Sequence, residues 1–465
     1  MTQQTLVFDR ELIRRYDRQG PRYTSYPTAV QFTDRFGVAQ YLEHARRTNE
    51  AAKPAPLSLY FHIPFCATVC FYCACNKVVT KNQAHTLRYL DSLCLEIERQ
   101  GRLFETSRKV EQLHWGGGTP TFLNQQQMGR LMDQARRHFS LLDNDEGEYS
   151  IEIDPRTVDA GRIVFLRELG FNRISLGVQD FDETVQRAVN RIQSEEQTLG
   201  IIAAARKSGF LSISLDLIYG LPHQSVASFD TTLNRVIDAS PERISVFNYA
   251  HLPHLFKTQR QIDENTLPLP EEKLRILHHA IEKLTDAGYI YIGMDHFAKP
   301  DDELAIAQRK GKLSRNFQGY ATHGECDIVG LGVSAIGRVG SSYSQNERDL
   351  EQYQSRIEAG DLAVFRGIEL TDDDVLRREV INQLICHFEL KTEDFKTRHG
   401  FEFWGYFVVE REELTGMQQD GLLSMDDTGI IVLPAGRLLI RNICMVFDKY
   451  LNNVADDKLR FSKVI

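Results

Sequence analysis

The sequence predicts an α/β fold, namely a partial (β/α)6 TIM-like barrel with extra strands, followed by a smaller, mainly α-helical C-terminal domain. Three observations support this prediction. Strand and helix patterns alternate six times between residues 57 and 248, polar or glycine-rich segments follow nearly every predicted strand, and charged helical patterns replace the alternation after about residue 366. A chain of 465 residues also exceeds the size at which one hydrophobic core stops growing, so more than one domain is expected.

Three parts of the chain are expected. They are an N-terminal arm over residues 1–55, a catalytic domain over 56–365 and a helical, winged-helix-like domain over 366–465. The arm contains Pro21–Ala29, a segment too rich in proline and aromatic residues for a regular helix. We expect it to lie extended over the domain that follows, unless it is simply a surface segment that buries Tyr23 and Tyr26.

The repeated strand–helix units predict a parallel sheet with right-handed crossovers. The six strands are expected near residues 57–63, 110–115, 149–153, 173–178, 212–218 and 243–248. Between them, apolar residues recur at helical spacing, as at Met128, Leu131, Met132 and Ala135. A doubly wound sheet and a barrel both fit this pattern. Functional groups at the ends of many strands favour the barrel, because a doubly wound sheet gathers its site at one crevice.

Several elements are predicted after the sixth strand. A helix is expected over residues 271–287 with Gly288 as its cap, then a strand over 289–294. The segments that follow, up to Gly330–Ile336, are expected to be polar loops with a functional role. The last part should contain helices over 372–388 and 404–414, a hairpin over 422–433 with its turn at 427–429, and a final helix that includes Leu438 and Phe447.

Composition and charge restrict the possible functions. Hydrophobic residues make up 42% and charged residues 26%, and no apolar run approaches the roughly 20 residues that span a bilayer. The first residues lack the features of a signal peptide, so a cytoplasmic location is expected, where clustered cysteines indicate metal binding or catalysis. The net charge of −9 argues against nucleic acid as a partner. The winged-helix pattern is therefore better explained as a lid or packing domain than as a DNA-binding domain.

Four of the eight cysteines lie in the ten residues from Cys66 to Cys75. Their spacing offers three well-placed thiolates, Cys66, Cys70 and Cys73. A structural zinc site would need a second pair of ligands, and none follows at the spacing of a zinc finger. Three thiolates suit a four-iron, four-sulfur cluster with one iron left open for a ligand. A buried cysteine cluster or a stray zinc site is the alternative interpretation.

Three consecutive glycines, Gly116 to Gly118, follow the second predicted strand. Without a Cβ atom they permit positive φ and close backbone approach, so this loop could offer N–H and C=O groups to the charged amino acid end of a cofactor. The lysine of a nucleotide-triphosphate loop is missing, which argues against ATP.

The cysteine loop resembles that of the radical S-adenosylmethionine enzymes. In that family the amino and carboxylate groups of S-adenosylmethionine chelate the open iron, and an electron from the cluster cleaves the sulfonium to give a 5′-deoxyadenosyl radical. A closer resemblance extends over essentially the whole chain, to the oxygen-independent coproporphyrinogen III oxidase family. The segments that carry it are Pro21–Ala29, His62–Cys75, His114–Thr121, Asn316–Tyr320 and Arg441–Asp448.

This resemblance implies that two propionates of coproporphyrinogen III are oxidatively decarboxylated to vinyl groups, which gives protoporphyrinogen IX in haem synthesis. The radical would abstract a hydrogen from the carbon β to each carboxylate, after which carbon dioxide leaves and an acceptor takes one electron. A reduced flavodoxin- or ferredoxin-like protein is the expected electron donor, and a monomer is expected. The alternative is a haem-degrading relative or a haem-binding chaperone that retains the cluster loop.

The resemblance also implies roles for individual residues. Cys66, Cys70 and Cys73 would hold the 4Fe-4S cluster. Contacts to the S-adenosylmethionine on the open iron would come from Tyr60, Gly117, Glu152, Ala250 and Ile336. The family binds a second S-adenosylmethionine, and the matching positions are Tyr72, Gly118, Thr119, Gln179, Arg191 and Asp216. Tyr72 departs from the family, since this position is associated with Phe. The chemistry is consistent, because carboxylates suit an ammonium, ribose hydroxyls or a sulfonium, and Arg191 suits a carboxylate.

Two further residues have a hypothetical role. A turn after Cys73 is expected to part its side chain from that of Cys75, which would leave the Cys75 thiol free for catalysis, either in positioning the second S-adenosylmethionine or in hydrogen transfer. A small buried hydrophobic side chain is the alternative interpretation of Cys75. Arg22, whose neighbours in the N-terminal arm include the aromatic residues Tyr23 and Tyr26, is expected to contact the anionic porphyrinogen.

Overall fold

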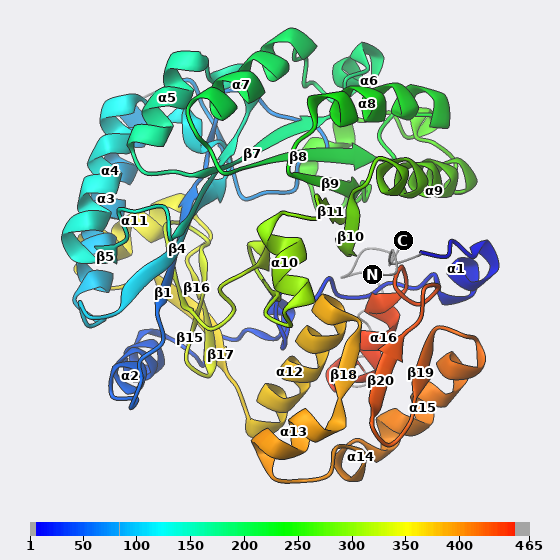
Figure 1. The fold of residues 1–465 in the computed structure, drawn as a ribbon. Coiled ribbons are helices and arrows are strands. Elements are labelled where there is room, and N and C mark those ends of the chain that lie inside the picture. The colour runs from blue at the N-terminus through cyan, green and yellow to red at the C-terminus, as the bar shows by residue number, and fades with distance from the viewer. Residues whose placement is uncertain (1–5, 83, 452–465) are drawn as a thin grey trace. The chain divides into compact units, whose positions relative to one another are not determined.

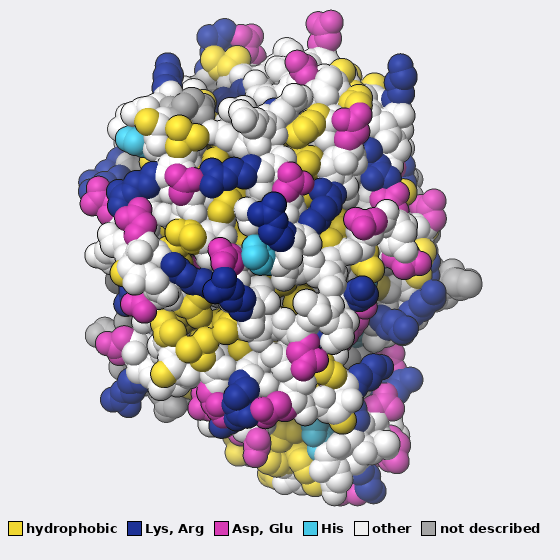
Figure 2. All heavy atoms as spheres, turned by 90° about the vertical axis from the view of Figure 1, so that its left-hand side faces the viewer, with side chains coloured by type: hydrophobic (Ala, Val, Ile, Leu, Met, Phe, Trp, Pro, Cys, Tyr) yellow, Lys and Arg dark blue, Asp and Glu magenta, His cyan; other side chains and the backbone are white. Residues whose placement is uncertain are grey.

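The structure is a computed structural model that describes residues 6–82 and 84–451. The chain divides into two compact units, each built from separate segments. Unit 1 consists of Met1–Val30, Ile281–Gly324 and Leu370–Ile465, and unit 2 consists of Gln31–Ala280 and Glu325–Glu369. Among the described helices, none combines the length and the apolar character needed to cross a membrane. On the face shown in Figure 2, Lys and Arg side chains lie interspersed with Asp and Glu.

Unit 2 is organised around a parallel sheet. Its six central strands are β1 (Leu57–Ile63), β4 (Lys109–Gly117), β6 (Glu148–Ile153), β7 (Arg173–Gln179), β8 (Ser212–Tyr219) and β9 (Arg243–Asn248). They are neighbours in chain order, and every adjacent pair is parallel. In β6, β7 and β8, buried apolar residues such as Ile151, Leu176 and Leu215 alternate with half-buried residues, so one face of each strand packs in the core and the other is partly open. The predicted parallel strand–helix units are confirmed.

The sheet continues beyond β1 with strands from later in the chain. β14 (Asp327–Leu331) is parallel to β1, and the antiparallel strands β15 (Ile336–Val339), β16 (Ser342–Asn346) and β17 (Val364–Glu369) follow in order. Among the described residues of unit 2, no pairing between β9 and β17 closes the sheet, so it is a partial barrel with extra strands. The prediction of polar loops is wrong for both ends of Gly330–Ile336, which lie in β14 and β15.

Helices cover the outer face of this sheet, as Figure 1 shows for α3, α4, α5, α7 and α8. The helices of unit 2 are α2 (Val38–Asn49), α3 (Ala84–Gly101), α4 (Gln125–His138), α5 (Ala160–Glu168), α6 (Glu183–Ala188), α7 (Glu195–Lys207), α8 (Val226–Ala239) and α11 (Leu350–Glu358). The sequence sets their limits locally. Asn124 and Gln127 form a reciprocal capping box at the start of α4, with both hydrogen bonds at 2.9 Å. The apolar stripe predicted for α4 is completely buried.

Unit 1 contains short strands and most of the later helices. Its elements up to residue 324 are α1 (Arg10–Tyr16), β10 (Ile290–Gly293), β11 (His296–Ala298), α10 (Glu303–Arg309), β12 (Ser314–Asn316) and β13 (Gly319–Ala321). Its later elements are α12 (Asp372–His387), β18 (Glu389–Lys391), α13 (Thr392–His399), α14 (Phe403–Tyr406), α15 (Val408–Gln419), β19 (Leu423–Met425), β20 (Gly429–Val432) and α16 (Ile440–Val446). The predicted helix 271–287 is α9 (Pro270–Asp286), whose residues belong to both units.

Two predictions for the C-terminal part need correction. The single helix expected over 404–414 is two helices, α14 and α15, because Phe407 leaves the helical conformation with φ −99° and ψ 49°. The predicted hairpin is confirmed as β19 and β20, but β18 joins it in a three-stranded antiparallel sheet.

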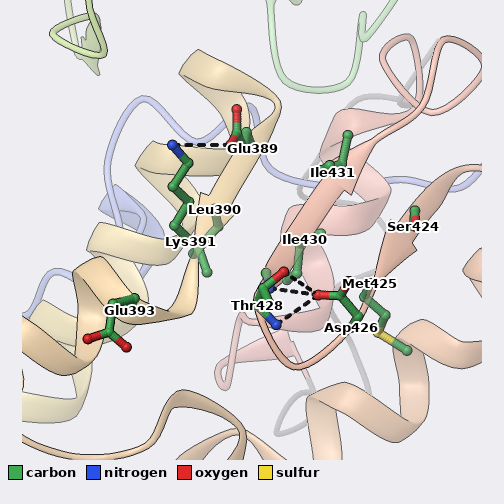
Figure 3. A pocket seen from close by; sticks show the side chains of 11 residues that line it. Glu389, Leu390, Lys391, Glu393, Ser424, Met425, Asp426, Thr428, Ile430 and Ile431 are labelled. Atoms are coloured by element: carbon green, nitrogen blue, oxygen red, sulfur yellow. Dashed lines mark hydrogen bonds and ion pairs between the residues drawn. The ribbon is translucent and has the colours of Figure 1, made fainter.

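A groove of about 300 Å³ lies over this small sheet (Figure 3). At one end of it, Asp426 accepts hydrogen bonds from the backbone N–H and hydroxyl of Thr428, at 2.7 and 2.5 Å, and from the N–H of Gly429 at 3.2 Å. These polar groups therefore close the turn between β19 and β20, and the groove includes none of the predicted site residues.

Within the N-terminal arm, residues 20–28 form no regular helix, as expected from their content of proline and aromatic residues. The helices α1 and α2 lie on either side of this segment. Within unit 1, Tyr23 is buried and its hydroxyl donates to Asp448 at 3.0 Å, while Arg441 Nε donates to the carbonyl of Pro21 at 2.9 Å. The segment thus packs on α16 and the residues after it.

A buried carboxylate joins the helix layer of unit 2 to the later strands. Glu96 of α3 is completely buried. It accepts hydrogen bonds from the N–H of Gly332 at 2.7 Å, from the amide of Asn346 at 2.7 Å and from the hydroxyl of Tyr353 at 2.6 Å. Burial nevertheless raises the pKa of Glu96 to about 7.

Replacing Glu96 by Ala should leave three buried donors unpaired, so we expect the free energy of unfolding to fall by about 3–5 kcal/mol. Glu98→Ala changes a partly exposed residue of the same helix and should cost about 0.5 kcal/mol or less. Denaturant unfolding at pH 7 checks both values. Similar losses in the two variants would contradict the role of Glu96.

The raised pKa of Glu96 also predicts that the free energy of unfolding depends on pH. A carboxyl group that binds its proton more tightly in the folded protein loses part of its stabilising effect as the pH rises from about 4.5 to about 7. Glu96→Gln cannot ionise and should lack this loss, although its amide fits the donors less well. Between about pH 4.5 and 7.5, the free energy of unfolding should therefore decline less for Glu96→Gln than for the wild-type protein. Equal declines in the two proteins would contradict the raised pKa of Glu96.

Candidate cofactor site

The predicted cluster ligands, cofactor-binding residues and Cys75 all lie in unit 2, at or near the carboxyl ends of the parallel strands, whereas Arg22 lies in unit 1. Tyr60 is in β1, Glu152 in β6, Asp216 in β8 and Ile336 in β15, whereas Gly117 and Gln179 end β4 and β7. Cys66 lies in the short strand β2, and the remaining site residues lie outside helices and strands, namely Cys70, Tyr72, Cys73, Cys75, Gly118, Thr119, Arg191 and Ala250. Because the strands are parallel, their carboxyl ends share one edge of the sheet, which brings these residues into one region.

The loop Cys66–Cys75 has little regular structure and depends on its neighbours for its shape. Its first strand, β2 (Phe65–Cys66), pairs with β3 (Val78–Val79), which closes the loop at its base. Asn190 donates its side-chain amide to the carbonyl of Val69 at 2.7 Å. Further along, the N–H of Phe71 donates to the carbonyl of Val189 at 3.0 Å.

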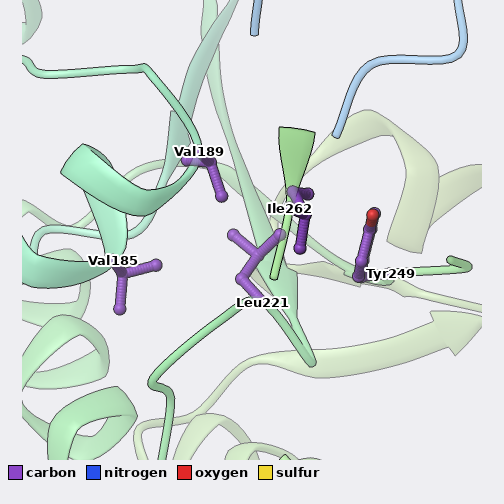
Figure 4. Packing of buried hydrophobic residues seen from close by; sticks show 5 residues of the cluster. All are labelled: Val185, Val189, Leu221, Tyr249 and Ile262. Atoms are coloured by element: carbon purple, nitrogen blue, oxygen red, sulfur yellow. The ribbon is translucent and has the colours of Figure 1, made fainter. Parts of the chain in front are cut away.

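A hydrophobic cluster supports the middle of the same loop. It consists of Val185, Val189, Leu221, Tyr249 and Ile262 (Figure 4), and Phe71 and Tyr72 pack against it. The two aromatic residues between Cys70 and Cys73 therefore anchor the loop on the domain core. For Tyr72, this contact gives a structural reason for an aromatic side chain.

The far end of the loop is held by the segment after β9. Gln259 is buried and donates its amide to the carbonyls of Tyr72 at 3.0 Å and Ala250 at 3.2 Å. The hydroxyl of Thr258 and the ammonium of Lys77 donate to the carbonyl of Cys73 at 3.1 and 2.9 Å. Because Gln259 bonds both carbonyls, Ala250 lies close to the cysteine loop.

The thiols of the loop have different surroundings. All eight cysteines of the chain are free thiols, and within the loop only Cys70 is buried, while Cys75 is exposed. Burial raises the pKa of the Cys66 thiol to about 11, although its sulfur lies 3.5 Å from the hydroxyl of Thr119. A hydrogen bond from the Cys75 thiol lowers the pKa of Cys73 to about 6 and raises that of Cys75.

That hydrogen bond corrects one prediction. A turn was expected to part the side chains of Cys73 and Cys75, but their thiols contact each other. The tight turn lies earlier, where the N–H of Cys73 donates to the carbonyl of Cys70 at 3.2 Å. Only a bend follows at Cys75, so the two sulfurs remain within reach.

Arg191 lies beside the sulfur of Cys70. Its Nη1 donates to Cys70 Sγ at 3.5 Å and to Asp154 at 3.1 Å, and its Nη2 donates to the carbonyl of Gly177 at 2.6 Å. The side chain is 8% exposed, and its buried Nε has no hydrogen-bond partner. A buried N–H without a partner is costly, so this atom is a candidate contact for a ligand.

Tyr60, His114 and Glu152 form a second group, on β1, β4 and β6. The rings of Tyr60 and His114 stack at 5.9 Å, and His114 Nε2 lies 3.4 Å from a carboxylate oxygen of Glu152. The other oxygen of Glu152 accepts from the N–H of Gly117 at 3.1 Å. Burial would raise the pKa of Glu152, but His114 and this N–H hold it below its ordinary value, so the carboxylate is anionic at neutral pH.

Gln179 and Asp216 form a third group, on β7 and β8. Gln179 has φ +67°, and the register of β7 against β8 shifts between Gly177 and Gln179. Asp216 accepts a hydrogen bond from the hydroxyl of Ser175 at 2.7 Å, and burial raises the pKa of Asp216 to about 6. A left-handed conformation beside a bulge is costly for a residue other than glycine and is common at ligand sites.

The three glycines at the end of β4, Gly116 to Gly118, act differently from the prediction. Only Gly117 has positive φ, at +111°, and a Cβ atom there would lie 2.6 Å from the ring of His62. The N–H of Gly117 donates to Glu152, that of Gly118 to the carbonyl of Ile63 at 2.8 Å, and that of Thr119 to the carbonyl of Phe65 at 2.9 Å. These N–H groups therefore bind the protein itself, so the expectation that the loop offers them to a cofactor is wrong.

Ile336 is also close to this region. Gly330 pairs with Tyr60 across β14 and β1, and a Cβ atom on Gly330 would lie 2.9 Å from the carbonyl carbon of Ile336. The prediction that Ile336 and Tyr60 contact the same S-adenosylmethionine is thus compatible with the geometry.

Sequence reasoning missed three residues that contact the site. Arg156 donates to Cys70 Sγ at 3.7 Å, Gln259 holds the carbonyl of Tyr72, and Ser175 bonds Asp216. Arg156 had a detectable signal, because it lies two residues after Asp154 at a strand end. Gln259 had none, since it lies in an irregular segment far along the chain.

Comparisons with known proteins agree along the whole chain. The family model of the radical SAM superfamily matches residues 60–236, and that of the HemN C-terminal domain matches residues 370–439. The oxygen-independent coproporphyrinogen III oxidase of Pseudomonas aeruginosa is 54% identical over 461 residues, which are 99% of both chains. The protein of the same name from Escherichia coli is 50% identical over 465 residues, the full length of both.

A solved structure is similar over nearly the same length. It is coproporphyrinogen III oxidase (HemN) from Escherichia coli, described as a radical SAM enzyme. The TM-score is 0.91 at 48% identity, and the match covers 96% of this chain and 100% of that chain.

The packing of the glycine loop gives a testable expectation. A Cβ atom on Gly118 would lie 2.7 Å from the backbone of Pro64, which cannot move aside, so Gly118→Ala should lower the free energy of unfolding by about 1–3 kcal/mol. Gly129 lies inside α4 with open space around it, and Gly129→Ala should stabilise by about 0.5–1 kcal/mol. Denaturant unfolding compares the two, and equal effects would contradict this packing.

Proposed function

The chain belongs to the oxygen-independent coproporphyrinogen III oxidase family, and on this basis we propose that it oxidatively decarboxylates coproporphyrinogen III to protoporphyrinogen IX. In each of two propionate side chains, one hydrogen atom is removed from the carbon β to the carboxylate. Carbon dioxide and one further electron are lost, and a vinyl group results. The reaction belongs to haem biosynthesis.

One observation carries this proposal. Cys66, Cys70 and Cys73 lie in a single loop at the carboxyl edge of the parallel sheet, and arginine side chains donate to the sulfur of Cys70. Cationic donors suit a sulfur that is a thiolate bound to metal, because they stabilise negative charge. The donor set of three thiols therefore fits the 4Fe-4S cluster of the radical SAM superfamily.

Cys66, Cys70 and Cys73 would hold that cluster, which together with S-adenosylmethionine supplies a 5′-deoxyadenosyl radical when both are bound. The protein itself holds the reactive groups in place and excludes water. The contact between the thiols of Cys73 and Cys75 would be replaced on binding, since Cys73 then bonds iron.

We propose that Tyr60, Gly117, Glu152, Ala250 and Ile336 contact the S-adenosylmethionine bound at the open iron. Glu152 supports this role, because it is an anionic carboxylate whose position is fixed by His114 and the N–H of Gly117. A carboxylate in that place favours an ammonium or a sulfonium. Since the N–H of Gly117 already bonds Glu152, its carbonyl is the group left for a contact.

A second S-adenosylmethionine is proposed at Tyr72, Gly118, Thr119, Gln179, Arg191 and Asp216. The unpaired Nε of Arg191 supports it, since a carboxylate would satisfy this buried donor. Both Gln179 Nε2 and Arg191 Nη2 lie within 3.0 Å of the position that a Cβ atom on Gly177 would take, so their side chains converge there.

The remaining assignments are also proposals. Cys75 is proposed as a catalytic residue, because it is an exposed residue at the edge of the cysteine loop. Arg22 is proposed to contact a propionate, although it forms an ion pair with Asp295 within unit 1. A reduced flavodoxin- or ferredoxin-like protein is proposed as the electron donor, and the protein is proposed to act as a monomer in the cytoplasm, where free clustered thiols persist.

The alternative of a haem-degrading relative or a haem-binding chaperone is not favoured. Relatives that are 50–54% identical over the whole chain carry the name of the oxidase.

A product assay tests the proposed function. Incubated without oxygen with coproporphyrinogen III, S-adenosylmethionine and a reductant, the protein should form protoporphyrinogen IX, 5′-deoxyadenosine and methionine, because each decarboxylation begins with hydrogen abstraction. Mass spectrometry should show the loss of two carboxyl groups from the porphyrinogen. Formation of 5′-deoxyadenosine without any decarboxylated product would contradict this substrate.

Cysteine variants separate the proposed roles in the loop. Cys70→Ser removes one of three ligands, so we expect a large loss of bound iron. Cys75→Ser should retain iron and the signal of the reduced cluster, while formation of protoporphyrinogen IX falls at least tenfold. Cys94→Ser changes a buried cysteine of α3 and should retain both iron and activity.

Iron analysis, electron paramagnetic resonance and the product assay check these outcomes. Full iron in Cys70→Ser would contradict the ligand assignment, and unchanged turnover in Cys75→Ser would return that residue to a packing role.

A further inference from the structure

Arg156 lies at the sulfur of Cys70 in a fixed orientation. It follows directly after β6, where Asp154 caps the short helix η3 (Pro155–Thr157) and accepts from the backbone N–H of Arg156 at 3.1 Å. The side chain of Arg156 folds back on the same carboxylate, with Nε 3.0 Å from Oδ1 and Nη2 2.7 Å from Oδ2. This two-point contact fixes the plane of the guanidinium group.

Two guanidinium groups meet at this sulfur. Nη2 of Arg156 donates to Cys70 Sγ at 3.7 Å, and Nη1 of Arg191 donates to it at 3.5 Å. Asp154 bonds both arginines, so one carboxylate balances only one of the two positive charges. The side chains of Arg156, Asp154 and Arg191 are 19%, 9% and 8% exposed, and solvent therefore screens the remaining charge weakly.

The neighbouring cysteine Cys66 has a different partner. Its sulfur contacts the neutral hydroxyl of Thr119 at 3.5 Å. The pair of arginines thus gives Cys70 a more positive surrounding than Cys66 has. Asp154 is already bonded by Arg191, so holding Asp154 in place does not by itself require Arg156.

We infer that Arg156, together with Arg191, stabilises the reduced state of the iron–sulfur cluster that Cys70 is proposed to hold, an inference that rests on the proposed function. A cluster gains one negative charge when it takes up an electron. Cationic N–H donors at a ligand sulfur stabilise the more negative state and raise the reduction potential. Arg156 acts through Cys70 and is therefore a positioning residue.

The test compares Arg156→Gln, Arg156→Lys and the wild-type protein, each carrying its cluster and kept without oxygen. Arg167→Gln is the matched control, because Arg167 also pairs with an aspartate, Asp145, but lies on α5 away from the cysteines. Iron and sulfide are counted per chain. The midpoint potential is then measured by titration with dithionite and mediators, in the absence of S-adenosylmethionine, with the paramagnetic signal of the reduced cluster as the readout.

We expect Arg156→Gln to bind the same iron as wild type and to have a lower midpoint potential, because all three cysteines remain and one positive charge is lost. Arg156→Lys, which retains the charge, should shift less, and Arg167→Gln should not shift. An unchanged potential in Arg156→Gln overturns the inference, as does loss of its iron, which would make Arg156 a structural residue. If the midpoint potentials of Arg156→Gln and Arg156→Lys shift equally, the positive charge of Arg156 is not the cause, and the inference is overturned.

The wild-type protein separates this inference from the proposed function. Wild type without iron overturns the proposed function and the inference together. Wild type with a four-iron cluster, compared with an Arg156→Gln variant of unchanged potential, overturns the inference alone.

Discussion

The structure of the site depends on how an irregular loop of ten residues is held in one shape. The loop Cys66–Cys75 has no helix and only one short strand pairing to fix it, so its backbone groups bond to segments far along the chain. Asn190 and Val189 hold its first half, and Gln259 and Thr258 its second half. Because those segments follow α6 and β9, the shape of the loop depends on parts of the chain that the parallel sheet holds in place.

Periodic patterns made much of the fold predictable. The six parallel strands were expected within a few residues of their observed limits, because buried strands and amphipathic helices alternate with different periods. Site residues such as Glu152 and Asp216 were expected where they lie, since the carboxyl ends of parallel strands share one edge. The individual site residues, however, came from the resemblance to a family, because spacing alone assigns no role to Ala250 or Ile336.

The incorrect predictions have a common physical cause. Tertiary contacts determine the local structure at these positions, and such contacts cannot be read from local sequence patterns. Phe407 interrupts a predicted helix where it is fully buried. Gly330–Ile336 looked like a loop, yet β1 offers an open edge to which β14 pairs. The glycines at the end of β4 were expected to contact a ligand, but the positions that their Cβ atoms would take lie against His62, Pro64 and Glu152. None of these partners is near in sequence.

The separate segments of unit 1 have a consequence for synthesis on the ribosome. The strands β1 to β9 are complete by residue 248, so much of unit 2 can fold while later residues are still being made. In contrast, Pro21 and Tyr23 bond Arg441 and Asp448, more than 400 residues later. The N-terminal segment of the nascent chain therefore lacks these bonding partners until almost the whole chain has been synthesised.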